Sequence, residues 1–156
     1  MKYLLIVLIL LAVVSPLMWF KSTPGQARAA AFRKRAGELG LRVQLVPDPD
    51  APDDERQPSA VRYLVQTVRE RHDGGPCSWT LLKSDHRGWA SPWRGWRWFR
   101  RAAPEHLHPR IALAIEQLPA DVTALREDRQ GVAAYWRETG EPEGVDRIAD
   151  ALKLLA

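Results

Sequence analysis

The chain has 156 residues, of which 46% are hydrophobic and 27% are charged, and its formal net charge is +4. This length allows one ordinary folded domain, and the composition excludes a wholly disordered chain. The single cysteine, Cys77, excludes a disulfide framework within the chain.

Residues 1–21 predict a transmembrane anchor. Tyr3 to Phe20 is an uncharged and mostly apolar run of 18 residues, which as a helix approaches the thickness of a bilayer core. Aromatic residues stand at both ends of the run, as in the belts at membrane interfaces. The alternative is a signal peptide cleaved near Ala27-Arg28-Ala29. The length of the run and the basic flank favour a retained single span.

Basic residues follow the anchor at once. Lys2 precedes it, whereas Lys21, Arg28, Arg33, Lys34 and Arg35 come after it. Because Lys and Arg are retained on the cytoplasmic side, we expect the N-terminus outside and the C-terminal domain in the cytoplasm. Arg33, Lys34 and Arg35 are candidate contacts to anionic lipid.

Residues 22–40 predict a basic juxtamembrane helix, with an apolar stripe at Phe32, Ala36 and Leu39 and a glycine stop at Gly40. Residues 41–156 then predict a single domain. It opens with a strand over 41–46, because apolar and polar residues alternate there. Residues 47–59 contain four prolines and five acidic residues, which predicts a flexible acidic loop.

A period-two pattern of side chains predicts a second strand, with Val61, Tyr63, Val65 and Thr67 on one face. A turn at 72–76 joins it as a hairpin to a strand over 77–83. Residues 84–92 read as a loop, and residues 93–99 read as a fourth strand.

The last third has the clearest periodicity. A helix begins at Pro109 with Ile111, Ile115 and Leu118 on its buried stripe, and Pro119 ends it. Residues 122–126 and 132–137 form a hairpin, with the apolar side chains of 132, 134 and 136 on one face. Pro142 opens a final helix whose apolar stripe comprises Val145, Ile148, Ala149, Leu152 and Leu155. The order of elements predicts an α+β fold with a mainly antiparallel sheet packed by helices.

The segment 89–101, WASPWRGWRWFRR, contains four tryptophans and four arginines. One interpretation is a strand with a half-buried aromatic face, on which Trp96 and Trp98 share one side. A second is a surface for anionic lipid or nucleic acid over residues 87–101, because aromatic rings and guanidinium groups bind headgroups, bases and phosphates. The acidic balance of residues 104–156 disfavours nucleic acid. The candidate surface contacts in this segment are Trp93, Arg94, Trp96, Arg97, Arg100 and Arg101.

No recognisable catalytic or metal-binding constellation is present. The histidines at 72, 86, 106 and 108, together with Cys77 and Asp85, match no standard metal-ligand spacing. Nucleophile-elbow, P-loop and dinucleotide-binding motifs are missing. We therefore expect a non-enzymatic domain without metal or cofactor, which binds a protein partner or acts as a scaffold.

Several stretches resemble a set of small gammaproteobacterial single-span membrane proteins of unknown role. They are the anchor, Arg33-Lys34-Arg35, Gly40-Leu41-Arg42-Val43, residues 118–122 and residues 131–140. In outline, the first 40 residues also resemble the YajC accessory subunit of the preprotein translocase. The resemblance implies a bacterial inner membrane location and, as a further alternative, a translocase-accessory role. The segment 89–101 has no counterpart in YajC, and the resemblance assigns no functional residue to this chain.

Overall fold

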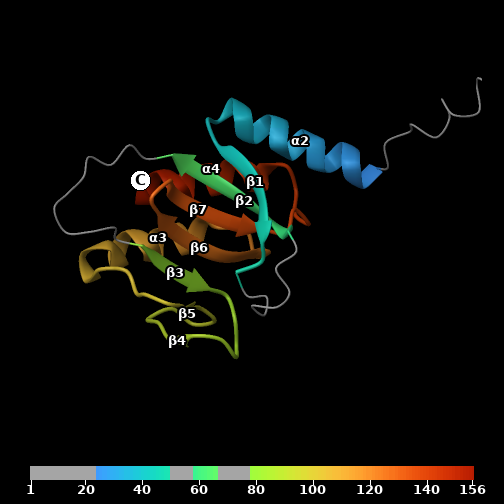
Figure 1. The fold of residues 1–156 in the computed structure, drawn as a ribbon. Helices are drawn as coiled ribbons and strands as arrows, with labels where there is room; N and C mark the ends of the chain where they lie inside the picture. Colours follow the sequence, from blue (N-terminus) through green and yellow to red (C-terminus); the bar gives the residue numbers. More distant parts are fainter. Residues whose placement is uncertain (1–23, 50–57, 67–77) are drawn as a thin grey trace, which may run out of the picture. The chain divides into compact units, whose positions relative to one another are not determined.

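The computed structural model describes residues 24–49, 58–66 and 78–156 (Figure 1). The predicted anchor, most of the acidic loop and the turn at 72–76 lie outside these ranges. In chain order the elements are α2 (Pro24–Glu38), β1 (Arg42–Pro47), β2 (Pro58–Gln66), β3 (Trp79–Leu82), β4 (Trp89–Ala90), β5 (Arg97–Trp98), the 3-10 helix η1 (Glu105–Leu107), α3 (His108–Gln117), β6 (Val122–Asp128), β7 (Gly131–Trp136) and α4 (Glu143–Leu155). The packing described below lies within residues 31–156, which form one compact unit.

The described strands form one antiparallel sheet of seven strands in the order β1-β2-β7-β6-β3-β5-β4. The predicted α+β class with a mainly antiparallel sheet is confirmed. Among the helices in the described ranges, none combines the length and the apolar character needed to cross a membrane.

The strand pairing differs from the sequence prediction in one important respect. β2 and β3 do not form a hairpin, because β2 pairs with β1 and β7 while β3 pairs with β6 and β5. The hairpin β6–β7 does form, with a two-residue turn. It inserts between β2 and β3, so the central pairings of the sheet join segments that are distant in sequence.

The second half of α2 packs on the domain as its stripe predicts. Phe32 and Ala36 are buried, and Leu39 is partly buried against the same core. Gly40 has a φ of 76°, and the amide of Leu41 donates to the carbonyl oxygen of Ala36 at 2.8 Å. This is the Schellman pattern that ends a helix, and it confirms the predicted glycine stop.

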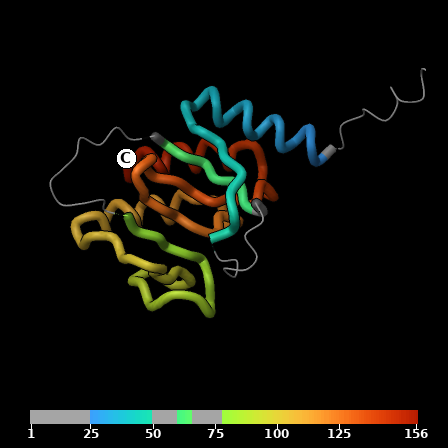
Figure 2. The backbone as a smooth tube through the Cα atoms, viewed as in Figure 1, coloured from blue at the N-terminus to red at the C-terminus, as the bar shows by residue number. Residues whose placement is uncertain are grey.

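The core lies between one face of the sheet and the helices. The sheet contributes Tyr63, Trp79, Leu125 and Trp136 among others, and all five residues of the predicted α4 stripe are buried against them. Figure 2 shows α3 and α4 running along the same side of the sheet. Burial of this apolar area is the main stabilising contribution to the fold.

The opposite face of the sheet carries a smaller cluster made by Ala60, Leu82, Ala124 and Tyr135, against which Phe99 packs. Polar residues join it. Arg62 is 6% exposed and donates from Nη2 to Asp128 Oδ2 at 2.6 Å. This ion pair offsets part of the cost of burying the arginine, whose Nε makes no hydrogen bond.

Candidate functional site

The tryptophan- and arginine-rich segment 89–101 lies at one end of the sheet. We call residues 87–101 the Arg/Trp edge. Within the described sheet, β4 pairs only with β5 and is the last strand, at the opposite end from β1 (Figure 1). The predicted loop over 84–92 therefore contains a short strand, and the predicted strand over 93–99 is reduced to residues 97–98.

A turn interrupts the predicted fourth strand. The amide of Trp96 donates to the carbonyl oxygen of Trp93 at 3.1 Å, and Gly95 between them has a φ of 79°. A type II turn needs this backbone conformation at its third residue. Ser91 Oγ also donates to the Trp96 carbonyl at 2.7 Å. Arg94 consequently lies exposed at the tip of the turn.

Gly88 fixes the pairing of β4 with β5. Its φ is 87°, and a Cβ atom at this position would overlap the carbonyl oxygen of Trp98. The guanidinium of Arg97 donates to the Gly88 carbonyl from Nε at 3.2 Å and from Nη2 at 2.8 Å. Arg97, a candidate surface contact, is thus engaged inside the edge.

Aromatic rings attach the Arg/Trp edge to the core. Trp98 contacts Trp79 at 6.2 Å and Trp93 at 5.6 Å between ring centroids, and His108 stacks on Trp98 at 5.8 Å. Trp96 is 7% exposed and belongs to the main core. The assignment of Trp96 as a surface contact is therefore corrected, because its burial leaves almost no area for a ligand.

Arg100 has an unusual backbone conformation, with a φ of 64°. The amide of Arg101 donates to the carbonyl oxygen of Phe99 at 2.7 Å, so these three residues form a γ-turn with Arg100 at its centre. Thr80 of β3 holds both ends of the turn, since it accepts from the Phe99 amide at 2.9 Å and donates to the Arg101 carbonyl at 3.2 Å. The neighbouring strand therefore maintains a strained turn that presents Arg100.

Two guanidinium groups lie over the Phe99 ring. The Cζ of Arg87 is 4.7 Å from the ring centroid and the Cζ of Arg100 is 5.3 Å from it. Cation–π contacts of this kind attract a guanidinium to the face of the ring. The surface predicted over residues 87–101 includes Arg87 and Phe99. The sequence does not single them out as individual contacts, because the γ-turn breaks the period-two pattern from which neighbours on a strand are inferred.

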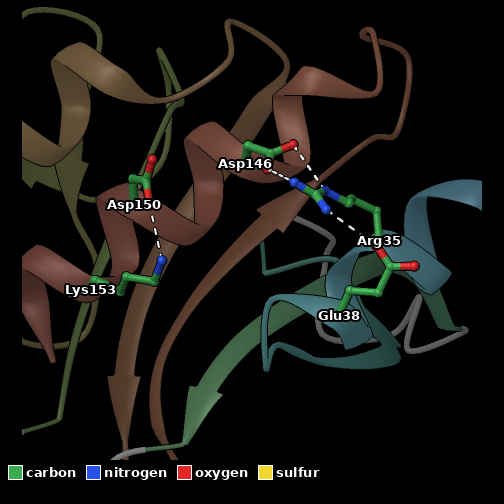
Figure 3. Close-up of polar contacts among 5 residues, drawn as sticks. All are labelled: Arg35, Glu38, Asp146, Asp150 and Lys153. Carbon is green, nitrogen blue, oxygen red and sulfur yellow. Dashed lines mark hydrogen bonds and ion pairs between the residues drawn. The ribbon is translucent and has the colours of Figure 1, made fainter.

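The basic residues of α2 have a different environment. Arg35 binds Asp146 of α4 through two contacts, Nη2 to Oδ1 at 2.6 Å and Nε to Oδ2 at 3.4 Å, and it also contacts Glu38 at 3.3 Å (Figure 3). The hydrogen bond from Arg35 lowers the pKa of Asp146. Lys34 is exposed.

Arg33 belongs to a second network. Its Nη2 lies 3.4 Å from Glu138 Oε2, and Glu138 Oε1 accepts the hydroxyl hydrogen of the fully buried Tyr63 at 2.6 Å. Of the three candidate lipid contacts in α2, Arg33 and Arg35 thus face carboxylates of the domain. The sequence does not predict the ion pairs of Arg33 with Glu138 and of Arg35 with Asp146, because the partners are more than 100 positions apart.

Within residues 24–49, 58–66 and 78–156, no group of three or more His, Cys, Asp or Glu side chains is arranged to hold a metal ion. His86 and His106 are exposed, and His108 stacks on Trp98. Cys77 and His72 lie outside the described residues. The arrangement that remains as a site is the Arg/Trp edge, which can present oriented guanidinium groups beside an exposed indole.

Comparison with protein-family models, with curated proteins and with solved structures found no match to this chain.

Proposed function

We propose that this chain is a membrane-tethered, non-enzymatic domain that binds a partner protein through the Arg/Trp edge. In this proposal it serves an accessory or scaffold role at the cytoplasmic face of a bacterial inner membrane. The tether is the apolar run from Tyr3 to Phe20, and the basic residues after it orient the domain toward the cytoplasm.

The observation that carries the proposal is the exposure of Trp89 on the last strand of the sheet. Its side chain is 46% exposed, and Arg94, Arg100 and Arg101 are exposed in the same edge. Tryptophan and arginine are the residues most enriched at the energetic centres of protein interfaces. A terminal strand can also pair with an added strand of a partner.

The ion pairs of α2 support a protein partner over lipid. Arg33 and Arg35 contact Glu138 and Asp146, so two of the three basic residues at 33–35 are engaged with carboxylates of the domain. Attraction to anionic headgroups depends on basic side chains near the surface of the bilayer. The ion pairs reduce the positive charge that this helix offers to lipid.

Site-specific cross-linking tests the interaction. A photoreactive residue replaces Trp89 in the full-length chain in native membranes. The matched control carries it at Leu45, which is 62% exposed on β1 at the other end of the sheet. We expect a discrete protein adduct at position 89 that is missing at position 45. No adduct at position 89, or equal adducts at both positions, would contradict the proposal.

Fractionation and fusion reporters test the tether and its orientation. Carbonate washing should leave the full-length chain in the membrane fraction, because an integral span resists it. A C-terminal fluorescent protein should be bright and a C-terminal alkaline phosphatase inactive. Release of intact protein by carbonate would contradict the tether, and an active phosphatase would place the domain outside.

A further inference from the structure

We propose that Arg100 and Arg87, stacked on Phe99, form a binding site for side-chain carboxylates of an acidic segment in the partner protein. This inference rests on the proposed function, since it names the chemistry of the partner at the same edge. The arginine fork matches a carboxylate because two parallel N–H groups can donate to its two oxygens.

The turn and the aromatic ring position Arg100 before any ligand binds. Its backbone lies in a γ-turn that β3 maintains through Thr80, and its guanidinium lies over the Phe99 ring. A contact with the ring uses none of the N–H groups of the guanidinium as conventional hydrogen-bond donors to oxygen, so an acceptor can still approach them. An arginine ordered in advance loses less conformational entropy on binding.

The segment around Arg100 carries an excess of positive charge. Residues 77–103 carry six basic side chains and one acidic one. Ion pairs engage Arg33, Arg35, Arg62 and Arg126, among others. In the described part of the chain, no ion pair involves Arg94, Arg97 or Arg100. The Arg/Trp edge thus keeps a positive charge that a partner with carboxylates would complement.

The backbone of Arg100 is strained, with a φ of 64°. Non-glycine residues in this region of φ are uncommon, and observed examples cluster at sites where strain serves binding or catalysis. Glycine would adopt the same turn without strain. The presence of arginine at this position therefore points to a use for its side chain.

Equilibrium binding to a labelled decapeptide of alternating Asp and Glu tests the inference, with the full-length protein in zwitterionic detergent. We expect salt-dependent binding that Arg100→Gln weakens about tenfold. Arg87→Gln should weaken it in the same direction. The matched control is Arg129→Gln, which removes the same charge from the exposed β6–β7 turn and should change affinity less than about twofold.

Two further variants separate geometry from charge and from folding. Arg100→Lys keeps the charge but loses the planar fork, so we expect it to bind as weakly as Arg100→Gln. Arg100→Gly keeps the turn without the side chain, so it should remain folded and bind weakly. Wild-type affinity in Arg100→Lys would overturn the inference, because it would show attraction to charge alone.

Other ligands give distinct outcomes in the same experiment. Vesicles containing phosphatidylglycerol and an oligonucleotide of twelve thymidines replace the peptide in parallel samples. We expect neither to bind more tightly than the peptide. If either binds more tightly and shows the same loss in Arg100→Gln, the acidic-segment inference is overturned. If the peptide fails to bind while the cross-link at position 89 persists, this inference fails and the proposed function stands.

Discussion

Two residues other than glycine have a positive φ in the described chain, Arg100 at 64° and Glu138 at 56°. Their side chains have different environments. Arg100 is exposed, whereas the Glu138 side chain is 9% exposed and accepts the Tyr63 hydroxyl hydrogen. The carboxylate of Asp121 holds the loop after Glu138, because it accepts from the Thr139 amide at 3.1 Å and the Thr139 hydroxyl at 2.8 Å. Hydrogen bonds hold the backbone at both positions, but only the Glu138 side chain is engaged inside the fold, whereas the Arg100 side chain is exposed.

Glycine substitutions at these two positions should have opposite effects on stability. Arg100→Gly relieves backbone strain and loses only an exposed cation–π contact, so we expect the free energy of unfolding to stay equal or rise by up to about 1 kcal/mol. Glu138→Gly removes the acceptor of a buried hydroxyl, so we expect a loss of about 1–3 kcal/mol. Denaturant unfolding of the two variants measures the difference, and a marked loss in Arg100→Gly would show that its side chain is structural.

The hydroxyl of Tyr63 predicts a dependence of stability on alkaline pH. Burial and the hydrogen bond to the Glu138 carboxylate raise the pKa of Tyr63 far above its ordinary value. The unfolded chain loses this proton near pH 10, whereas the folded chain retains it. The contribution is therefore complete below about pH 10 and declines as the pH rises above that value.

Thermal unfolding from pH 8 to pH 11 measures this effect, and absorbance at 295 nm follows tyrosinate formation. We expect a steeper fall of the melting temperature above about pH 10 in the wild type than in Tyr63→Phe. Identical pH profiles in the two proteins would mean that Tyr63 ionises in the folded state as readily as in the unfolded chain.

At the scale of elements, we expect the stability of the β4–β5 hairpin to depend more on Gly88 than on Gly95. Gly88 and Gly95 both have a positive φ, 87° and 79°. A Cβ on Gly88 would overlap the Trp98 carbonyl, whereas a Cβ on Gly95 would meet no atom within 4 Å. The two positions therefore separate backbone strain from steric overlap.

Alanine at the two glycines should show that difference. Gly95→Ala should cost about 1 kcal/mol from backbone strain alone. Gly88→Ala should cost clearly more, because the overlap forces β4 away from β5. Trp98 and Trp93 lie beside this pairing, so the emission of tryptophan should also change in Gly88→Ala. Equal costs for the two substitutions would exclude this account of the hairpin.

At the scale of the whole molecule, stability comes from the layer between the sheet and the helices. Leu152 on α4 is fully buried in this layer, whereas Leu113 on α3 is 52% exposed. The same change at both positions therefore compares a core side chain with a surface one of identical chemistry.

Leu152→Ala should lower the free energy of unfolding by about 2–5 kcal/mol, because it removes buried apolar area and leaves a cavity. Leu113→Ala should change it by less than about 0.5 kcal/mol. Denaturant titration followed by circular dichroism measures both. A small effect of Leu152→Ala would mean that α4 contributes little to the stability of the domain.

Local patterns in the sequence determined most of the elements outside residues 84–99. The five-residue apolar stripe of α4, the stop of α2 at Gly40 and the hairpin β6–β7 all formed as predicted, because periodicity and turn residues act between near neighbours. The α+β class followed from the order of these elements.

Contacts between distant residues decided the rest. β7 lies between β2 and β6, which prevents the predicted pairing of β2 with β3. Arg33 and Arg35 form ion pairs with carboxylates 105 and 111 positions away. Trp96 packs in the core, and hydrogen bonds from β3 maintain the turn at Arg100. The sequence thus determined most of the helices and strands, though not the short strands β4 and β5, and it determined where arginines are concentrated. Only the tertiary structure decided which of these arginines are paired, because pairing depends on strand order and packing that no local pattern encodes.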